Sequence, residues 1–425
     1  MKQILNSLDT PTRREFVERC AAKSFGLSIL PATQLMAVDP ADDQTPAGFG
    51  KAKSVIWLML SGGLSHIDSL DPKQGKSKGP AAAINTSADY RVTEFFPKFA
   101  SVADQVSVIR SMEAKIGVHK PAQYFMRTAY EPRGTILHPN LGAWGSHYLG
   151  RSSSTLPSSV CINRRSDQGN GFFPSSFAPL AIGDPSQGIN DVESIGGRSA
   201  SNKRLTLLNG LDADFRRKFN DKGVNAYNGF YDDALSLMKS KELKAFDLSH
   251  EPEEQRAAYG DNSFGQGCLL ARRLVDSGVR FVEVRQEGWD HHKALADEMG
   301  EVAPVFDQAF TTLITDLQQR GMLDSTLVVV ATEFGRKPAF SGDGRSHHPI
   351  CFSTVLAGGG TKAGFVYGKS DNDGYYVDEN PVSVGSFHAS IAFAAGMDIS
   401  KPAISPSGRP MTVGDGENPV MELFS

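Results

Sequence analysis

Short apolar runs constrain the fold of this chain more than any other feature. The runs at 54–60 and 326–331 are continuous, and the second reads Thr-Leu-Val-Val-Val-Ala. Runs of this length without polar alternation are typical of strands buried on both faces of a parallel sheet. A strand pattern at 279–285 follows a helical pattern at 264–277. A second helical pattern, at 297–321, precedes the run at 326–331. This alternation predicts an α/β fold with a mostly parallel central sheet covered by helices on both faces.

Polar side chains follow these predicted strands, and a His-His pair precedes a further apolar run at 350–356. In open α/β sheets, ligands bind at the carboxyl ends of the strands. Four of the ten histidines stand in these segments, so the sequence predicts a reaction site there. The candidate residues are Asp290, His292, Glu333, Arg336, His347 and His348.

Asp290 and His292 stand two residues apart after a strand. A carboxylate and an imidazole close together form half of a divalent metal site. In the alternative interpretation, the imidazoles of this loop bond to the backbone and Asp290 caps the next helix. His347 and His348 are adjacent on an extended segment, where neighbouring side chains point apart, so we expect one of them to be a ligand.

Glu333 follows the buried Val-Val-Val strand, where a charge needs a partner. It could ligate a metal or act as a general base, and the alternative is a salt bridge to Arg336 that ties the loop. His119 lies just before Pro121, at the start of a predicted helix. Helix N-termini favour anions, so a nucleophile placed there is well situated to attack a phosphate or sulfate ester.

The segment after the first strand, Ser61 to Asp68, begins with two glycines after its serine. It is not a phosphate-binding loop, because no Gly-Lys-Ser/Thr follows. Within it, His66 and Asp68 are metal or acid–base candidates. In the alternative interpretation, the segment is a strained turn that Asp68 caps.

Composition and charge narrow the class of protein. The 425 residues are 40% hydrophobic and 22% charged, with a formal net charge of −4, as in ordinary soluble globular proteins. The mild acidity gives no indication of a nucleic-acid partner, and no apolar stretch is long enough to span a bilayer.

The N-terminus carries an export pattern. Thr12 to Val17 reads Thr-Arg-Arg-Glu-Phe-Val, and a mildly apolar stretch over 20–37 follows it. The order of these features favours a twin-arginine signal over 1–37, rather than an amphipathic helix with two arginines. We therefore expect a periplasmic or secreted protein.

The remaining chain, 50–425, is expected to form one domain with an insertion at about 150–260. Residues 150–200 are rich in Ser, Gly, Pro and Asn, and 203–258 carry charged helical patterns. These compositions are typical of a loop over the sheet followed by a helical cap.

Several motifs together resemble the bacterial family called domain of unknown function 1501. They are Gly62–Lys73, Arg110–Met112, Gly288–His292, Glu333–Arg336, His347–Pro349 and Ala357–Gly360. That family looks like a branch of the alkaline phosphatase/sulfatase superfamily. The resemblance implies a three-layer α/β/α sandwich, one or two metals, and hydrolysis of phosphate or sulfate esters.

The resemblance is uneven at the expected site. His119 stands where sulfatases carry the nucleophile of a Cys/Ser-x-Pro-x-Arg segment, so no formylglycine is expected, and Ser61 stands where the superfamily has a metal-binding Asp. The implied site holds one divalent ion, such as zinc, calcium or manganese, and acts on a small-molecule or glycan ester. The implied metal ligands are Asp290, His292, and His347 or His348.

The same resemblance implies roles for three further residues. Glu333 is a further ligand or the general base, His119 is the nucleophile or a proton donor, and Arg336 holds the anionic group. The alternative is a non-catalytic member that binds an anionic ligand or a partner protein.

The export signal is testable by itself. Replacing Arg13 and Arg14 by Lys should leave the protein in the cytoplasm, because the twin-arginine receptor reads paired guanidinium groups. Fractionation of cells expressing both forms measures this. Equal export of the double variant and the wild type would contradict the signal.

Overall fold

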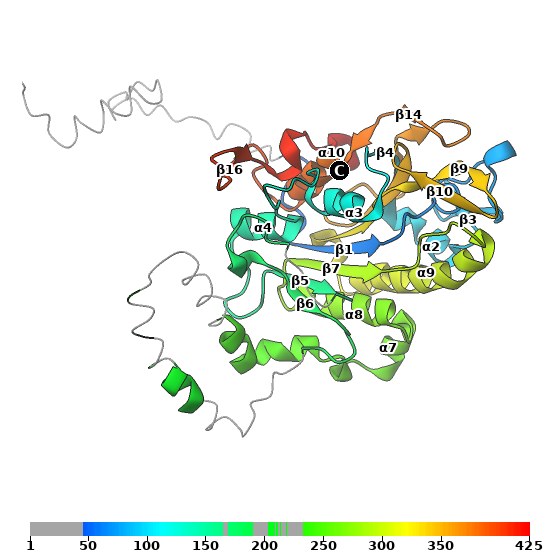
Figure 1. The fold of residues 1–425 in the computed structure, drawn as a ribbon. Coiled ribbons are helices and arrows are strands. Elements are labelled where there is room, and N and C mark those ends of the chain that lie inside the picture. Colours follow the sequence, from blue (N-terminus) through cyan, green and yellow to red (C-terminus); the bar gives the residue numbers. More distant parts are fainter. Residues whose placement is uncertain are drawn as a thin grey trace, which may run out of the picture. The chain divides into compact units, whose positions relative to one another are not determined.

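A central sheet of nine strands organises the described part of the chain (Figure 1). The computed structural model describes residues 46–164, 169–189, 203–208, 210, 213, 218 and 233–425. The predicted signal at 1–37 lies outside these residues. The strands follow the order β12 (Phe365–Tyr367), β4 (Val106–Glu113), β11 (Phe352–Ala357), β8 (Thr326–Ala331), β1 (Ser54–Leu60), β7 (Phe281–Gln286), β5 (Ser159–Ile162) and β6 (Leu180–Ile182), with β15 (Val382–Ser383) beside β4.

The strand directions confirm a mostly parallel sheet. Every pairing within it is parallel except those of β11, which runs antiparallel to both β4 and β8. The bounds of β1 and β8 match the two continuous apolar runs of the sequence. Because β11 is reversed, the residues that precede it lie at the same edge as the residues that follow β4 and β8.

Helices cover both faces of the sheet (Figure 1), which confirms a three-layer α/β/α sandwich. Along β1, Ile56 and Leu58 belong to one apolar cluster, whereas Val55 and Trp57 belong to another. The first cluster includes α2 (Pro97–Ser101), α7 (Glu253–Tyr259), α8 (Ser263–Asp276) and α9 (Leu295–Gln319). The second includes α3 (His119–Thr128), α4 (Leu141–Leu149) and α10 (Val384–Ala394). The alternation of side chains along the strand thus builds one core on each face.

The expected insertion at about 150–260 is in part wrong. Strands β5 and β6 fall inside it, yet they extend the central sheet beyond β7 by parallel pairing. The sequence did not show this, because β5 and β6 are short and lie among Ser, Gly and Pro residues. The later part contributes η6 (Lys241–Phe246), η7 (Leu248–His250) and α7.

Smaller elements lie outside the central sheet. They are the strand pairs β2 (Ala83–Asn85) with β3 (Arg91–Thr93), β9 (Gly335–Ser341) with β10 (Gly344–His348), β13 (Lys369–Ser370) with β14 (Val377–Glu379), and β16 (Ala403–Ile404) with β17 (Pro410–Met411), together with the 3-10 turns η3 (Gly75–Ser77), η4 (Ala103–Gln105), η5 (Ser175–Phe177), η8 (Leu323–Ser325), η9 (Val413–Gly416) and η10 (Met421–Leu423).

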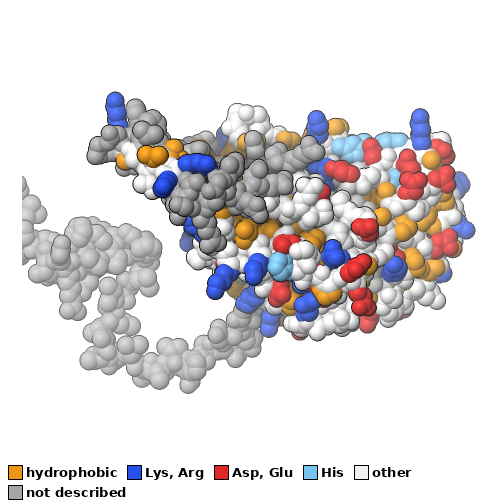
Figure 2. All heavy atoms as spheres, turned by 90° about the horizontal axis from the view of Figure 1, so that it is seen from below, with side chains coloured by type: hydrophobic (Ala, Val, Ile, Leu, Met, Phe, Trp, Pro, Cys, Tyr) orange, Lys and Arg blue, Asp and Glu red, His pale blue; other side chains and the backbone are white. Residues whose placement is uncertain are grey.

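The surface seen from below the view of Figure 1 carries both signs of charge among scattered apolar side chains (Figure 2). Mixed charge of this kind is typical of a solvated face. Among the described residues, no helix combines the length and the apolar character needed to cross a bilayer.

A buried ion pair anchors the β9–β10 hairpin to the loop after β1. Arg345 Nε lies 2.7 Å from Asp68 Oδ2, and neither side chain is exposed. His66 in the same loop is buried, and its Nε2 lies 2.9 Å from the carbonyl oxygen of Gly374. Both candidates from this loop are therefore buried and bonded to distant parts of the chain.

His388 makes the stability of the fold depend on pH. It is buried in α10, its Nε2 donates to the carbonyl of Met126 over 2.7 Å, and burial lowers its pKa from 6.5 to about 4. The folded state therefore disfavours the charged ring. The resulting stabilisation is complete above pH 6.5 and is lost as pH falls from 6.5 towards 4.

We expect wild type to lose ~2–3 kcal/mol more of its free energy of unfolding than His388→Gln between pH 7.5 and pH 4.5. Urea denaturation of both proteins at both pH values measures this. The glutamine keeps a donor for Met126 but does not titrate. Parallel losses in the two proteins would show that His388 does not carry the effect.

Candidate metal centre

Four segments converge at the carboxyl edge of the sheet. Asp290 and His292 follow β7, and Glu333 follows β8. His119 begins α3 after β4, and His347 lies on β10, just before the reversed strand β11. The segments that follow parallel strands lie at the same edge of the sheet. Because β11 is antiparallel to its neighbours, the segment before it, which contains His347, lies at that edge too.

Three histidines and one aspartate form a compact cluster there. Their ligand atoms all lie within 4.8 Å of one another: His119, Asp290, His292 and His347. His119 Nε2 lies 3.1 Å from Asp290 Oδ2, and His292 Nε2 lies 3.1 Å from Asp290 Oδ1. His347 Nε2 lies 2.9 Å from His292 Nε2 and 3.5 Å from Asp290 Oδ1. Four possible ligand atoms thus lie close together.

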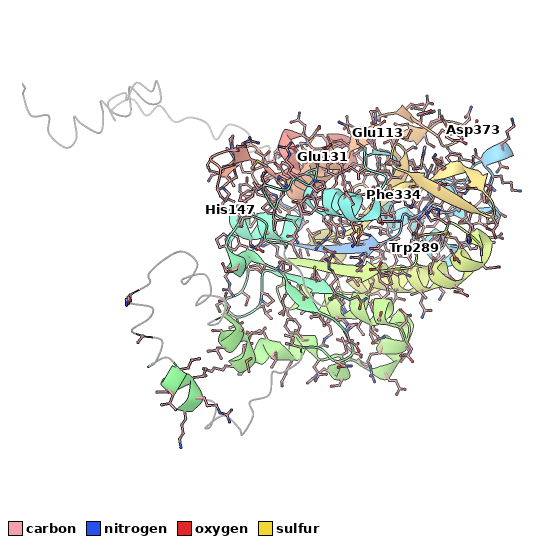
Figure 3. All side chains as sticks on the ribbon, viewed as in Figure 1. Glu113, Glu131, His147, Trp289, Phe334 and Asp373 are labelled. Atoms are coloured by element: carbon pink, nitrogen blue, oxygen red, sulfur yellow. The ribbon has the colours of Figure 1, made fainter. Side chains whose placement is uncertain are left out.

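Hydrogen bonds on the far side of two rings set their orientation. His347 Nδ1 lies 2.7 Å from the carbonyl oxygen of Gly117, so that nitrogen carries the proton. His119 Nδ1 lies 2.9 Å from Glu333 Oε1. Phe334, labelled in Figure 3, contacts both rings, with centroid separations of 5.0 and 4.5 Å. In both histidines Nε2 is thereby directed at the cluster, the arrangement that outer hydrogen bonds give to metal-binding histidines.

Glu333 is fully buried behind this cluster. Its Oε1 accepts from the backbone N–H of Gly62 at 2.9 Å and from Gln123 Nε2 at 3.0 Å, in addition to contacting His119. Gly62 has φ +127°, and a Cβ there would lie 2.5 Å from the backbone nitrogen of Asp290. Glycine is therefore required where the loop after β1 passes the backbone of the segment after β7.

Arg336 differs from the expectation that it holds an anionic group. Its side chain is completely buried. Its nitrogens donate to the carbonyl oxygens of Gly63 and Arg345, both at 2.9 Å, and of Trp289 at 3.3 Å. A further carbonyl, that of Gly62, and Asp290 Oδ1 also accept from Nη2. The guanidinium is enclosed by these acceptors, so its donors are used by Asp290 and by the surrounding loops.

His348 does not join the cluster. Its Nε2 lies 2.7 Å from the carbonyl oxygen of Tyr375, and its ring stacks on His66 at a centroid separation of 6.3 Å. The neighbouring His347 points to the opposite side of the strand, as adjacent side chains on extended backbone do. Of the two candidates, His347 is thus the one placed to ligate a metal.

The electrostatics of the cluster favour a positive charge beside an ionised Asp290. The hydrogen bond that His119 donates to Glu333 raises the pKa of His119, against the effect of burial, and the charge of Asp290 adds to the rise. Burial acts to raise the pKa of Asp290, but the hydrogen bond and charge of Arg336 outweigh it and lower that pKa. Burial lowers the pKa of His347. A negative Asp290 faces three imidazoles, which is the charge pattern of a divalent metal site.

Sequence reasoning missed two contributors. Gln123 and the carbonyl of Gly117 orient the cluster from outside it. Gln123 stands four positions after His119 on the predicted helix, and this spacing places both side chains on one face. That signal was available, whereas the role of a backbone carbonyl carries no signature in side-chain identity.

Comparison with known proteins identifies the family. Residues 52–424 match the family described as protein of unknown function (DUF1501), and the chain belongs to it. A comparison with curated protein sequences finds no match.

Solved structures show distant likeness. The sulfatase PsFucS1 from Pseudoalteromonas sp. has a TM-score of 0.43 at 12% identity, over 88% of this chain and 72% of that one. The alkaline phosphatase of the Antarctic bacterium TAB5 has a TM-score of 0.35 at 13% identity, over 76% of this chain and 95% of that one. The phosphonate monoester hydrolase SpPMH from Silicibacter pomeroyi has a TM-score of 0.34 at 11% identity, over 81% and 74%. Likeness at this level assigns no chemistry to the chain.

The burial of Arg336 generates a stability prediction. We expect Arg336→Lys to lower the free energy of unfolding by about 2–5 kcal/mol, because an ammonium group lacks the planar fork and leaves buried carbonyls without donors. Urea denaturation measures this, with Arg91→Lys as the control, since Arg91 is exposed and donates to one carbonyl. Equal stability of the two variants would refute the anchoring role of Arg336.

Proposed function

We propose that this member of the DUF1501 family is an exported, metal-dependent hydrolase of phosphate or sulfate esters. The observation that carries the proposal is the cluster of His119, Asp290, His292 and His347 at the carboxyl edge of the sheet. Catalytic and ligand sites of α/β sheets lie at this edge. The twin-arginine pattern supports export to the periplasm or the medium.

The donor atoms fit a small divalent ion. Four contacts between donors, which involve both oxygens of Asp290, measure 2.9–3.5 Å, and the edge of a tetrahedron is about 3.3 Å for ligands at 2.0–2.1 Å from the metal. Three imidazoles and one carboxylate suit zinc or another ion that prefers nitrogen. Calcium prefers six to eight oxygen ligands, so this donor set favours zinc over calcium.

The chain supplies binding and orientation around the ion. A divalent ion in this position would polarise an ester oxygen and lower the pKa of a bound water. Asp290 and His292 have side chains 46% and 47% exposed, which leaves that side of the cluster open to an ester. His119 presents Nε2 to the cluster, so we propose it as a ligand rather than as the nucleophile.

The surroundings of Glu333 argue against its expected role as the general base. A general base must reach the proton that it abstracts, directly or through one water. The Glu333 side chain is fully buried, and the ring of His119 stands between its Oε1 and the cluster. We therefore propose that it acts through His119 rather than on the substrate.

A non-catalytic member of the family is the second candidate. Four protein ligands can complete a tetrahedral shell, which is the arrangement of structural zinc sites. In a protein of this kind the metal would be structural, and the surface around it would bind an anionic ligand, such as a sulfated glycan, or a partner protein. Turnover separates the two candidates, because both of them bind metal.

Removing one ligand at a time tests the metal centre. We expect Asp290→Asn, His292→Ala and His119→Ala each to abolish stoichiometric metal in the purified protein, measured by elemental analysis. His250→Ala is the matched control, because His250 also lies 3.1 Å from an aspartate, Asp247, but outside the cluster. Metal content equal to wild type in all variants would refute the centre.

The same variants also test whether the protein hydrolyses esters. Phosphate mono- and diesters and aryl sulfates, small-molecule or glycan-linked, are the substrates to screen. Loss of a metal that activates the attacking water should lower turnover by ~100-fold or more, on the scale of a lost acid–base group, and chelation should do the same to wild type. Bound metal without turnover of any of these esters would favour the non-catalytic candidate.

A further inference from the structure

We propose that Glu333 is a positioning residue that turns His119 Nε2 towards the metal. The inference rests on the proposed metal centre for its consequence, but the underlying hydrogen bond is measurable in the metal-free protein. The two residues lie 214 positions apart in the sequence, on β8's loop and at the start of α3, with His119 Nδ1 2.9 Å from Glu333 Oε1.

The position of Glu333 excludes a role as a ligand of the same ion. Its Oε1 contacts Nδ1 of the imidazole, whereas the cluster lies on the side of Nε2, 3.1 Å from Asp290 Oδ2. The two nitrogens occupy different edges of the ring. A carboxylate on one edge and a metal on the other is the carboxylate–histidine–metal arrangement.

Three donors hold the Glu333 carboxylate in place. The backbone N–H of Gly62 comes from the loop after β1, and Gln123 and His119 come from α3. A buried carboxylate needs such partners, because removing a charge from water is costly. Its second oxygen, Oε2, has no hydrogen-bond partner among the described residues. Only Oε1 therefore holds the ring of His119 in its orientation.

The orientation of Gln123 is itself determined. Its Oε1 accepts from Arg285 Nη2 at 3.1 Å, and an arginine can only donate. The amide nitrogen therefore faces Glu333, where it lies 3.0 Å from Oε1. A chain of contacts from β7 through α3 to Glu333 thus leaves the carboxylate as the acceptor for His119.

A second glutamate that contacts α3, Glu283, provides a matched control. Arg127, on the same face of α3 as Gln123, contacts Glu283 Oε2 at 2.8 Å. Glu283 lies on β7, so both glutamates bridge the sheet and α3. Only Glu333 touches a residue of the cluster.

The test compares zinc affinity in four full-length proteins: wild type, Glu333→Gln, Glu333→Leu and Glu283→Gln. Competition titration with a chromogenic zinc chelator gives the dissociation constants. Loss of an outer carboxylate lowers metal affinity by about 10–100-fold. We expect the lower end for Glu333→Gln, whose amide oxygen can still accept, the upper end for Glu333→Leu, and no change for Glu283→Gln.

The proton on His119 provides a second readout that a merely structural role would not move. Proton–nitrogen NMR, assigned with His119→Ala, should show a proton on His119 Nδ1 in wild type and in Glu333→Gln, with or without zinc. In the zinc-free proteins, we expect this signal to be lost in Glu333→Leu and unchanged in Glu283→Gln. With zinc on Nε2, the proton of a neutral ring stays on Nδ1 in every variant, so only the zinc-free spectra discriminate.

The outcomes separate the inference from the proposed function. Unchanged zinc affinity in both Glu333 variants, while His119→Ala lowers it, would overturn the positioning role and leave the metal centre intact. If wild type binds no zinc, the metal centre fails and the Nδ1 proton alone decides, with persistence in Glu333→Leu counting against the inference. If Glu333→Leu does not fold, the affinity of Glu333→Gln decides.

Discussion

The site depends on one buried guanidinium. Arg336 donates to carbonyls of the loop after β1, the loop after β7 and strand β10, and it also holds Asp290 Oδ1. No other residue type has five donors in a planar fork that could satisfy this many acceptors from one buried position. Its charge also keeps Asp290 ionised, which ties the geometry of the loops to the electrostatics of the cluster. A polar group buried at this depth is costly without partners, so the loops and the guanidinium stabilise each other.

The reversal of β11 is the second constraint. In a purely parallel sheet, the segment before a strand lies at the opposite edge from the segments that follow its neighbours. Because β11 is antiparallel to β4 and β8, the hairpin that precedes it lies over the carboxyl edge. This places His347 2.9 Å from His292, although 55 positions separate them in the sequence. The buried pair of Arg345 with Asp68 then anchors the hairpin to the loop after β1.

Together these constraints divide the polar residues of the edge into two groups. Asp290 and His292 are half-exposed and available to a ligand, whereas Arg336 and Glu333 are buried and orient them or their neighbours. A charged side chain after a strand can therefore be either a reacting group or a support for one. Burial and hydrogen-bond partners distinguish the two roles, and this distinction changes the roles proposed for Arg336 and His119.

The sequence by itself determined the α/β class, the bounds of β1 and β8, and the segments that meet at the carboxyl edge, because continuous apolar runs and helical periodicity report burial locally. It also indicated Asp290, His292 and one of two adjacent histidines as a group. Only the tertiary structure decided that His347 lies in the cluster and His348 outside it, and that His119 faces the cluster through Nε2. It also decided that β5 and β6 belong to the sheet. The physical reason is that the direction of a ring nitrogen, and the burial of an arginine, depend on carbonyls and carboxylates from segments that are distant in the chain.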